Sequence, residues 1–200
     1  MSTIGIIGAG AIGSAFARAL AAKGLKAIIA NRRGGESLAE LAREMGPSIT
    51  PGTREQAAAQ DIVLVAVNWT KVPTALAGLP DFGGRIVIDA NNPIEPPTFA
   101  AADLHGRMSS EVFAALVPGA RVVKAFNHLP AHLISDDPQA EGGRRVLFVA
   151  GDEEAAKRAV GGLIEQLGFF PVDLGSLTGG GQLIQIPGGA LSVLNLVKVG

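Results

Sequence analysis

Short apolar runs alternate along the chain with stretches in which apolar residues recur every three or four positions. Runs rich in valine, isoleucine and leucine, without polar alternation, are typical of parallel strands that are buried on both faces. They predict strands at Thr3–Ile7, Ala27–Ala30, Asp61–Val67, Arg85–Asp89, Arg121–Phe126, Val146–Ala150 and Phe170–Leu174.

The stretches between these runs carry helical periodicity and helix-ending residues. After the first run, Ile12, Phe16 and Leu20 recur every four residues, and Gly24 follows as a stop signal. Three more helices are predicted from Leu38, Leu41 and Met45 before Gly46-Pro47, from the capping box Thr53-x-x-Gln56, and from Glu153 to Leu167. Alternating strands and helices predict an α/β fold: a doubly wound, mostly parallel sheet with a small C-terminal addition.

A glycine-rich turn joins the first predicted strand to the first predicted helix. It reads Gly8-Ala9-Gly10-Ala11-Ile12-Gly13, a G-x-G-x-x-G in the context that a Rossmann dinucleotide site requires. Gly8 can make the tight turn, Gly10 leaves room for a pyrophosphate, and Gly13 lets the helix pack close to the strand. The free N–H groups at the start of the helix favour phosphate. The alternative is a structural glycine turn without a ligand.

The end of the second predicted strand indicates which dinucleotide would bind. An NAD enzyme usually places Asp or Glu about 20 residues after the glycines, where it binds the ribose hydroxyls. This chain has Asn31-Arg32-Arg33 there, so no carboxylate repels a 2′-phosphate and two guanidinium groups can bind it. Ser37 can add a hydroxyl contact. The pattern favours NADP over NAD, and the alternative is a solvated basic turn.

Polar residues also follow three other predicted strands, at the carboxyl edge where α/β sheets bind ligands. These ends are Ala66-Val67-Asn68-Trp69, Asp89 to Pro93, and Lys124 to His128. Trp69 either packs on the cofactor or belongs to the core, and His128 either contacts a substrate or is a buried structural histidine. Asp89 is expected to satisfy backbone donors. No metal site is expected from His128 and His132, since no carboxylate cluster accompanies them.

Composition excludes several function classes. Without cysteine the chain has no disulfide, thiolate metal site or thiol catalysis, and without tyrosine it cannot use the Tyr-x-x-x-Lys pair of short-chain dehydrogenases. A net charge of −1 without a basic stripe does not support a nucleic-acid partner. The apolar run Ile62–Val67 is far shorter than the roughly 20 residues of a membrane span, and no basic residue precedes Ile4 as in a signal peptide. We expect a cytoplasmic protein without membrane partners.

Five strings of the chain are shared with a known family: the glycine turn, Asn31-Arg32-Arg33, Asp89-x-x-Asn92-Pro93, Val122-Val123-Lys124-Ala125-Phe126-Asn127 and Gly151-Asp152-Glu153-Glu154-Ala155. They resemble the NADPH-dependent coenzyme F420 reductases, and the nucleotide-binding module also resembles that of the STEAP metalloreductases. The resemblance extends from Ile4 to about Leu177 and implies an NADP-binding Rossmann domain over residues 1–177. Residues 178–200 would then form a C-terminal segment that contacts the substrate or a second subunit.

The resemblance implies an oxidoreductase that transfers a hydride between NADP(H) and a deazaflavin (coenzyme F420) or flavin acceptor. It implies no catalytic residue, because transfer between two stacked rings mainly needs proximity and orientation. It implies a homodimer, which the apolar tail also favours. The acceptor would lie near His128, Leu129 and the C-terminal segment. At position 128 this chain departs from the family, which commonly has threonine or a similar small residue there. NADP would be held by Gly8, Gly10, Ala11, Ile12, Gly13, Asn31, Arg32, Arg33 and Ser37, with its nicotinamide lined by Ala66, Val67, Asn68, Asn92, Pro93, Ala125 and Asn127.

Three other functions remain open at this point. A hydroxyacid or imine reductase would share the nucleotide domain but needs a long helical C-terminal domain, and only 26 residues follow Leu174. An NADPH-dependent flavin or ferric reductase agrees with the metalloreductase resemblance. A non-catalytic NADP-binding sensor would have the same fold and cofactor site, and an open cleft above the nicotinamide would argue against it.

Overall fold

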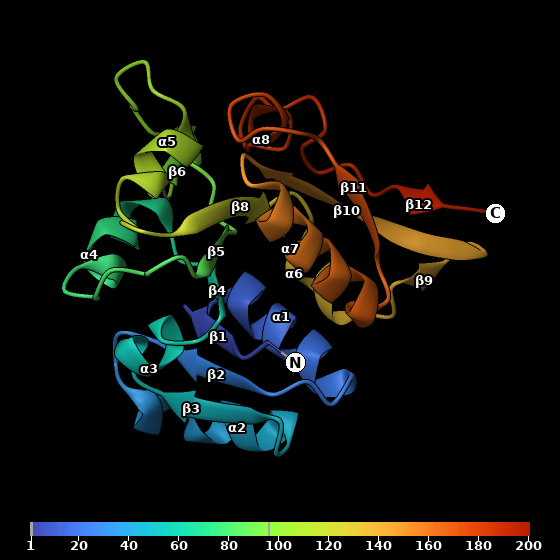
Figure 1. The fold of residues 1–200 in the computed structure, drawn as a ribbon. Coiled ribbons are helices and arrows are strands. Elements are labelled where there is room, and N and C mark those ends of the chain that lie inside the picture. The colour runs from blue at the N-terminus through green and yellow to red at the C-terminus, as the bar shows by residue number, and fades with distance from the viewer. Residues whose placement is uncertain (1, 96) are drawn as a thin grey trace.

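A ten-stranded sheet organises the computed structural model, which describes residues 2–95 and 97–200 (Figure 1). Adjacent strands along its main path pair in parallel, except β8 and β10, which are antiparallel. The path runs in the order β11 (Phe170–Asp173), β10 (Gly143–Gly151), β8 (Arg121–Ala125), β5 (Ile86–Asp89), β4 (Ile62–Val65), β1 (Ile4–Ile7), β2 (Ala27–Ala30) and β3 (Ile49–Gly52). The predicted fold class, a doubly wound and mostly parallel sheet, is confirmed.

Alternate residues of the central strands face two separate hydrophobic cores. In β4, Ile62 and Leu64 join the core that contains Phe16, while Val63 and Val65 join the core that contains Phe113. Successive side chains of a strand point to opposite faces of the sheet, so a strand covered on both faces must be apolar at every position. This explains the uninterrupted apolar runs from which the strands were predicted.

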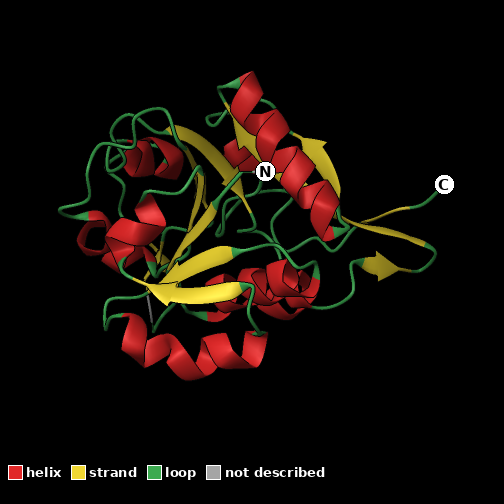
Figure 2. Cartoon of the chain, turned by 60° about the horizontal axis from the view of Figure 1, so that its bottom comes forward, coloured by secondary structure: helices red, strands yellow, loops and turns green. Residues whose placement is uncertain are grey.

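Helices cover both faces of the sheet, as Figure 2 shows. The core containing Phe16 is closed by α1, α2, α6 and α7, and the core containing Phe113 by α3, α4 and α5. The helices are α1 (Ala11–Ala22), α2 (Ala39–Met45), α3 (Arg54–Ala58), α4 (Val72–Leu76), α5 (Ser109–Ala114), α6 (Ala131–Ser135), α7 (Glu154–Leu167) and α8 (Gly180–Leu183), with 3-10 turns η1 (Gly35–Leu38) and η2 (Trp69–Lys71).

All seven predicted strands are present, and the predicted capping box is confirmed: the Thr53 hydroxyl accepts from the Gln56 N–H, and the Gln56 side chain accepts from the Thr53 N–H. The sequence did not predict β3, whose four residues include Pro51 and Gly52. Proline is tolerated there because β3 pairs only with β2, at the edge of the sheet.

Short strands extend the sheet at its far end. β9 (Gln139–Ala140) and β12 (Val197–Lys198) pair with the start of β10, and β6 (Ile94–Glu95) pairs with β7 (Ala100–Ala101) in a separate hairpin. Between β11 and β12 the chain passes through α8, which packs against β10. We call residues 180–193 the C-terminal strap. Within the described residues, no helix is both long and apolar enough to cross a membrane.

Candidate functional site

The glycine turn between β1 and α1 has two glycines that the fold itself requires. Gly8 has φ of 112°, and a Cβ there would lie 2.1 Å from the carbonyl oxygen of Ala66. A Cβ at Gly13 would lie 1.9 Å from the carbonyl oxygen of Gly8. Both distances are far below van der Waals contact, so these two positions allow the helix, the turn and β4 to approach one another.

Gly10 is different, because no packing contact explains it. Among the described residues beyond its neighbours, no heavy atom lies within 4 Å of the position that a Cβ would take. Gly10 is the N-cap of the twelve-residue helix α1, and no side chain caps the first turn. The open space in front of free N–H groups at a helix start suits a pyrophosphate. A Cβ at Gly10 would project into this open space.

The loop after β2 is organised around Asn31. Its Oδ1 accepts a hydrogen bond of 2.8 Å from the backbone N–H of Arg33, and its Nδ2 donates over 3.0 Å to the hydroxyl of Ser37. The Ser37 hydroxyl in turn donates to the carbonyl of Gly34 over 2.8 Å. These bonds fix the loop, while the side chains of Arg32 and Arg33 are exposed and have no carboxylate partner within the described part of the chain.

A buried ion pair joins the ends of β5 and β8. Lys124 Nζ lies 2.9 Å from Asp89 Oδ2, both side chains are fully buried, and Lys124 also donates to the carbonyl of Asn91. Asp89 Oδ1 accepts from the backbone and the side-chain amide of Asn91. Asn91 Oδ1 accepts from the N–H of Val67, which fixes the end of β4. Asp89 therefore satisfies one backbone donor, where several were predicted, and its other partners are the Asn91 side chain and Lys124.

The role of Lys124 was not recognised in the sequence. The signal that could have revealed this role is a charged residue at the end of each of two apolar strands. Asp89 is the last residue of β5, and Lys124 is the last but one of β8. Asp89 and Lys124 are direct partners in the parallel register of β5 and β8. Because two facing buried charges must be paired, the register turns two isolated charges into one ion pair.

Asn92 and Asn127 form a reciprocal pair at the same edge of the sheet. Asn92 Nδ2 donates to the carbonyl of Asn127 over 2.7 Å, and Asn127 Nδ2 donates to Asn92 Oδ1 over 3.0 Å. Asn127 Nδ2 also donates to the carbonyl of Ile184 over 2.7 Å, and the N–H of Ile186 donates to Asn92 Oδ1 over 2.9 Å. The pair thus joins the loops after β5 and β8 to the C-terminal strap. Asn127 Oδ1 is buried without a partner among the described residues.

Phe126, between Ala125 and Asn127, has an unusual backbone conformation. Its φ is 63°, in the left-handed region that bulky residues rarely adopt, and its side chain is fully buried. Its ring packs edge-to-face on Phe16 of α1, with 4.9 Å between the ring centroids. This turn directs Asn127 towards Asn92 and the strap. Backbone strain of this kind often occurs at functional sites.

The two residues predicted on the substrate side, His128 and Leu129, are both buried, with 0% and 3% of their surfaces exposed. The His128 ring lies 4.8 Å from the ring of Phe148, and neither ring nitrogen has a hydrogen-bond partner in the described chain. Burial lowers the pKa of His128 to about 4, against a smaller opposing effect of the Val146 backbone. In this conformation neither side chain is accessible to a second substrate.

The remaining predicted residues lie around these groups. Ala66 and Pro93 are buried, Val67 and Asn68 are more exposed, and the Trp69 side chain packs partly buried against the core containing Phe113. Within the described residues no group of three or more His, Asp or Glu side chains is arranged to hold a metal ion.

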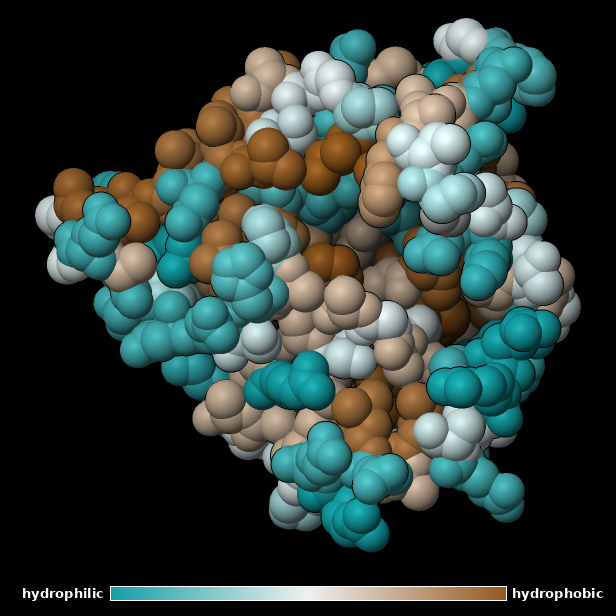
Figure 3. All heavy atoms as spheres, turned by 180° about the vertical axis from the view of Figure 1, so that it is seen from behind, coloured by the Kyte–Doolittle hydropathy of each residue, from teal (hydrophilic) through white to brown (hydrophobic). Residues whose placement is uncertain are grey.

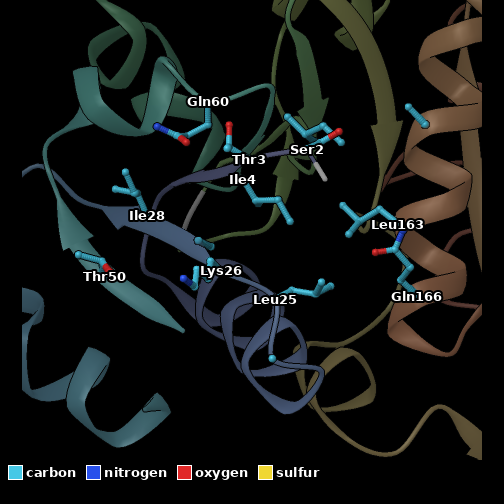
Figure 4. Close-up of a pocket in the computed structure, with 14 residues that line it drawn as sticks. Ser2, Thr3, Ile4, Leu25, Lys26, Ile28, Thr50, Gln60, Leu163 and Gln166 are labelled. Atoms are coloured by element: carbon cyan, nitrogen blue, oxygen red, sulfur yellow. The ribbon is translucent and has the colours of Figure 1, made fainter. Parts of the chain in front are cut away.

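A cavity of about 770 Å³ lies at the other edge of the sheet, where β1, β2 and β4 begin (Figure 4). It is bounded on its far side by α7 and contains none of the predicted site residues. Its lining includes Thr3, Ile4, Lys26, Ala27, Ile62 and Leu163. Ligands of open α/β sheets bind at the carboxyl ends of the strands, so this cavity is separate from the edge where the predicted site residues lie.

Solved structures of other proteins share this fold, and part of the chain matches a described protein family. Residues 3–93 match the family described as NADP oxidoreductase, coenzyme F420-dependent. The hypothetical protein SMa0349 from Sinorhizobium meliloti is 46% identical with a TM-score of 0.94, and the match covers 99% of this chain and 96% of that one. A protein of Arthrobacter sp. FB24, provisionally named an F420-dependent NADP-reductase, is 29% identical with a TM-score of 0.75, over 89% of this chain and 86% of that one.

Other proteins match this chain over only part of their own length. Metalloreductase STEAP3 of Rattus norvegicus is 29% identical over 187 residues, which are 92% of this chain and 36% of that protein. This chain therefore spans only about a third of the length of the curated relatives it matches. A reductive aminase from Aspergillus terreus, 22% identical with a TM-score of 0.64 over 90% of this chain and 56% of that one, shows the fold alone. The chain is an NADP-binding oxidoreductase domain, and its residues 3–93 match the family of coenzyme F420-dependent NADP oxidoreductases.

Proposed function

We propose that this chain catalyses hydride transfer between NADP(H) and a deazaflavin or flavin acceptor. The observation that carries the proposal is the loop after β2, where Asn31 stands in place of an acidic residue and two arginines are exposed without carboxylate partners in the described chain. This loop suits a 2′-phosphate, and the open space at Gly10 suits the pyrophosphate. The acceptor class is proposed from the family description and from the Arthrobacter relative.

The residues of the chain would bind and orient rather than react. When bound, NADPH would supply the hydride and become NADP⁺, and the acceptor would take up the hydride together with a proton from water. Gly8 to Gly13 would hold the pyrophosphate, and Asn31 to Ser37 the adenosine phosphate. The nicotinamide would be lined by the residues at the ends of β4, β5 and β8, which are Ala66 to Asn68, Asn92 and Pro93, and Ala125 to Asn127. His128 and Leu129 would support the acceptor side from beneath.

Replacing Arg32 by alanine tests the 2′-phosphate site. A lost charge-assisted hydrogen bond costs about 1.5–3 kcal/mol, so the dissociation constant of NADPH should rise about tenfold to a hundredfold. That of NADH, which lacks the phosphate, should change little. Both constants can be measured from nicotinamide fluorescence. Glu36→Ala, which changes a charge on the same loop, is the matched control and should not raise the NADPH constant. An unchanged ratio of the two constants in Arg32→Ala would contradict the assignment.

The acceptor is tested by mixing the protein with NADPH and oxidised coenzyme F420, or with a flavin, and following the absorbance of the acceptor. We expect protein-dependent bleaching of F420 that is much slower with NADH. Reduction of the flavin alone would favour the flavin or ferric reductase, a candidate supported by the similarity to STEAP3 over the nucleotide-binding part. Tight NADPH binding with neither acceptor reduced would discard the enzyme and favour a sensor, a candidate supported by the burial of His128 and Leu129.

We also propose a homodimer, formed through the apolar C-terminal residues. Val193, Leu196 and Val199 are large hydrophobic residues with 62%, 41% and 60% of their surfaces exposed. Figure 3 shows the molecule from behind. Apolar side chains gather at its upper left, on the side towards which the C-terminus projects. Exposed apolar patches of this kind often mark protein contacts. A monomeric mass in solution would contradict this proposal.

A further inference from the structure

The cavity where β1, β2 and β4 begin has no part in the proposed function. Its volume of about 770 Å³ lies within the range of about 300–1,000 Å³ that small-molecule sites occupy. Ile4 at the start of β1 lines the cavity, whereas the glycine turn follows Ile7 at the end of β1. Because a parallel strand rises about 3.3 Å per residue, these two isoleucines lie about 10 Å apart. A ligand in the cavity therefore leaves the glycine turn accessible.

One side of the cavity is formed by Ile4, Ile62 and Leu163, which we call the apolar wall. These residues have 5%, 4% and 5% of their surfaces exposed and belong to one hydrophobic core. The two isoleucines are direct partners in the parallel register of β1 and β4. Leu163 comes from α7, and Figure 4 shows it across the cavity from Ile4. The apolar wall suits a hydrocarbon chain or ring.

The other side of the cavity is more polar and carries a positive charge. Ile28 and its register partner Thr50 line it on the face of the sheet away from the apolar wall. Lys26, two residues before Ile28, is exposed and has no carboxylate partner among the residues that the structure describes. The carboxylate of Asp61 at this edge of the sheet accepts from the N–H and the hydroxyl of Thr3. The charge of Lys26 therefore favours a ligand that brings its own carboxylate.

We propose that this cavity binds an amphipathic carboxylate of the size of a medium-chain fatty acid, with its hydrocarbon part against the apolar wall and its carboxylate at Lys26. A neutral or cationic ligand of the same length uses the wall but not the charge. The proposal goes beyond hydride transfer and does not depend on it, because the cavity shares no residue with the predicted dinucleotide site.

Isothermal titration calorimetry with hexanoate, octanoate and decanoate tests the class of ligand. Each added pair of buried methylenes should lower the dissociation constant about tenfold. Octylamine and octanol should bind about threefold to tenfold more weakly than octanoate, because neither brings a carboxylate to Lys26. Saturating NADPH should change the octanoate constant less than about twofold. Absence of decanoate binding, equal binding of octylamine, or competition with NADPH would each overturn the proposal.

The variants Lys26→Met and Lys23→Met locate the carboxylate. Both lysines are exposed, but Lys23 does not line the cavity. Lys26→Met should raise the octanoate dissociation constant about threefold to tenfold, and Lys26→Arg, which keeps the charge, should restore binding. Lys23→Met should leave the constant unchanged. Equal effects of the two methionine variants would show a general attraction to positive charge and would overturn the site at Lys26.

The variants Ala159→Phe and Ala155→Phe locate the hydrocarbon part. Both alanines are exposed on α7, but only Ala159 lines the cavity, so a phenylalanine ring there takes up ligand space without entering the core. Ala159→Phe should raise the octanoate dissociation constant about tenfold or more while NADPH binds as in the parent chain, which also shows that the variant is folded. Ala155→Phe should change neither constant. Equal octanoate binding by the two variants would place the hydrocarbon part elsewhere and overturn the proposal.

Discussion

Replacing Lys124 by methionine is expected to lower the free energy of unfolding by about 3–5 kcal/mol, which is among the largest effects of any single change in the chain. Methionine matches the length of the lysine stem but removes the charge that lies 2.9 Å from Asp89 Oδ2. The Asp89 carboxylate would then remain fully buried without a counter-charge. Urea denaturation of the purified variant measures the loss.

Two further variants identify the cause of that loss. In Lys124→Met/Asp89→Asn the buried charge is gone, and the side chain at position 89 still offers an oxygen to the Asn91 N–H, so at least half of the stability should return. Arg158→Met breaks a pair with Glu154 in which both side chains are more than 60% exposed, and should cost less than about 1 kcal/mol. A double variant no more stable than Lys124→Met would rule out the ion pair as the cause.

Local patterns were enough to predict the layers of the fold. Strands β1 and β4 at the centre of the sheet carry no polar residue because both of their faces are covered, and the glycine turn stands where β1 meets α1. The edge strand β3 escaped prediction because its residues Pro51 and Gly52 resemble a loop. It forms nevertheless, since its partner β2 supplies the pairing and an edge strand needs hydrogen bonds on one side only.

The candidate site was predictable where its chemistry is local and not where it depends on distant partners. The glycines and Asn31 act through neighbouring backbone, so spacing was sufficient to find them. The attachment of Asn127 to Ile184 spans 57 residues, and that of Ile186 to Asn92 spans 94. Neither leaves a periodic signal. The burial of His128 beside Phe148 of β10 is likewise a contact between distant segments, and the sequence left open whether this histidine is buried or contacts a substrate.

The alanine variants Gly10→Ala and Gly13→Ala are expected to separate the ligand role of the glycine turn from its structural role. Both should raise the NADPH dissociation constant about tenfold or more, because each hydrogen bond lost to a charged group costs about 1.5–3 kcal/mol. Only Gly13→Ala should also lower the free energy of unfolding, by about 1–3 kcal/mol, because its Cβ would lie 1.9 Å from the Gly8 carbonyl oxygen and force α1 away from β1. Fluorescence titration and urea denaturation give the two quantities.

The contrast between the two variants depends on Gly10 facing open space. Its φ of −81° is available to alanine, so the variant should stay within about 0.5 kcal/mol of the parent stability. Gly162→Ala in α7, also without a neighbour within 4 Å in the described chain, is the control and should gain up to about 1 kcal/mol of stability with unchanged binding. If Gly10→Ala is as stable as the parent and binds NADPH equally well, no phosphate approaches Gly10 closely, and the proposed position of NADP is wrong. If it is stable and loses NADPH, Gly10 is glycine because the ligand requires it.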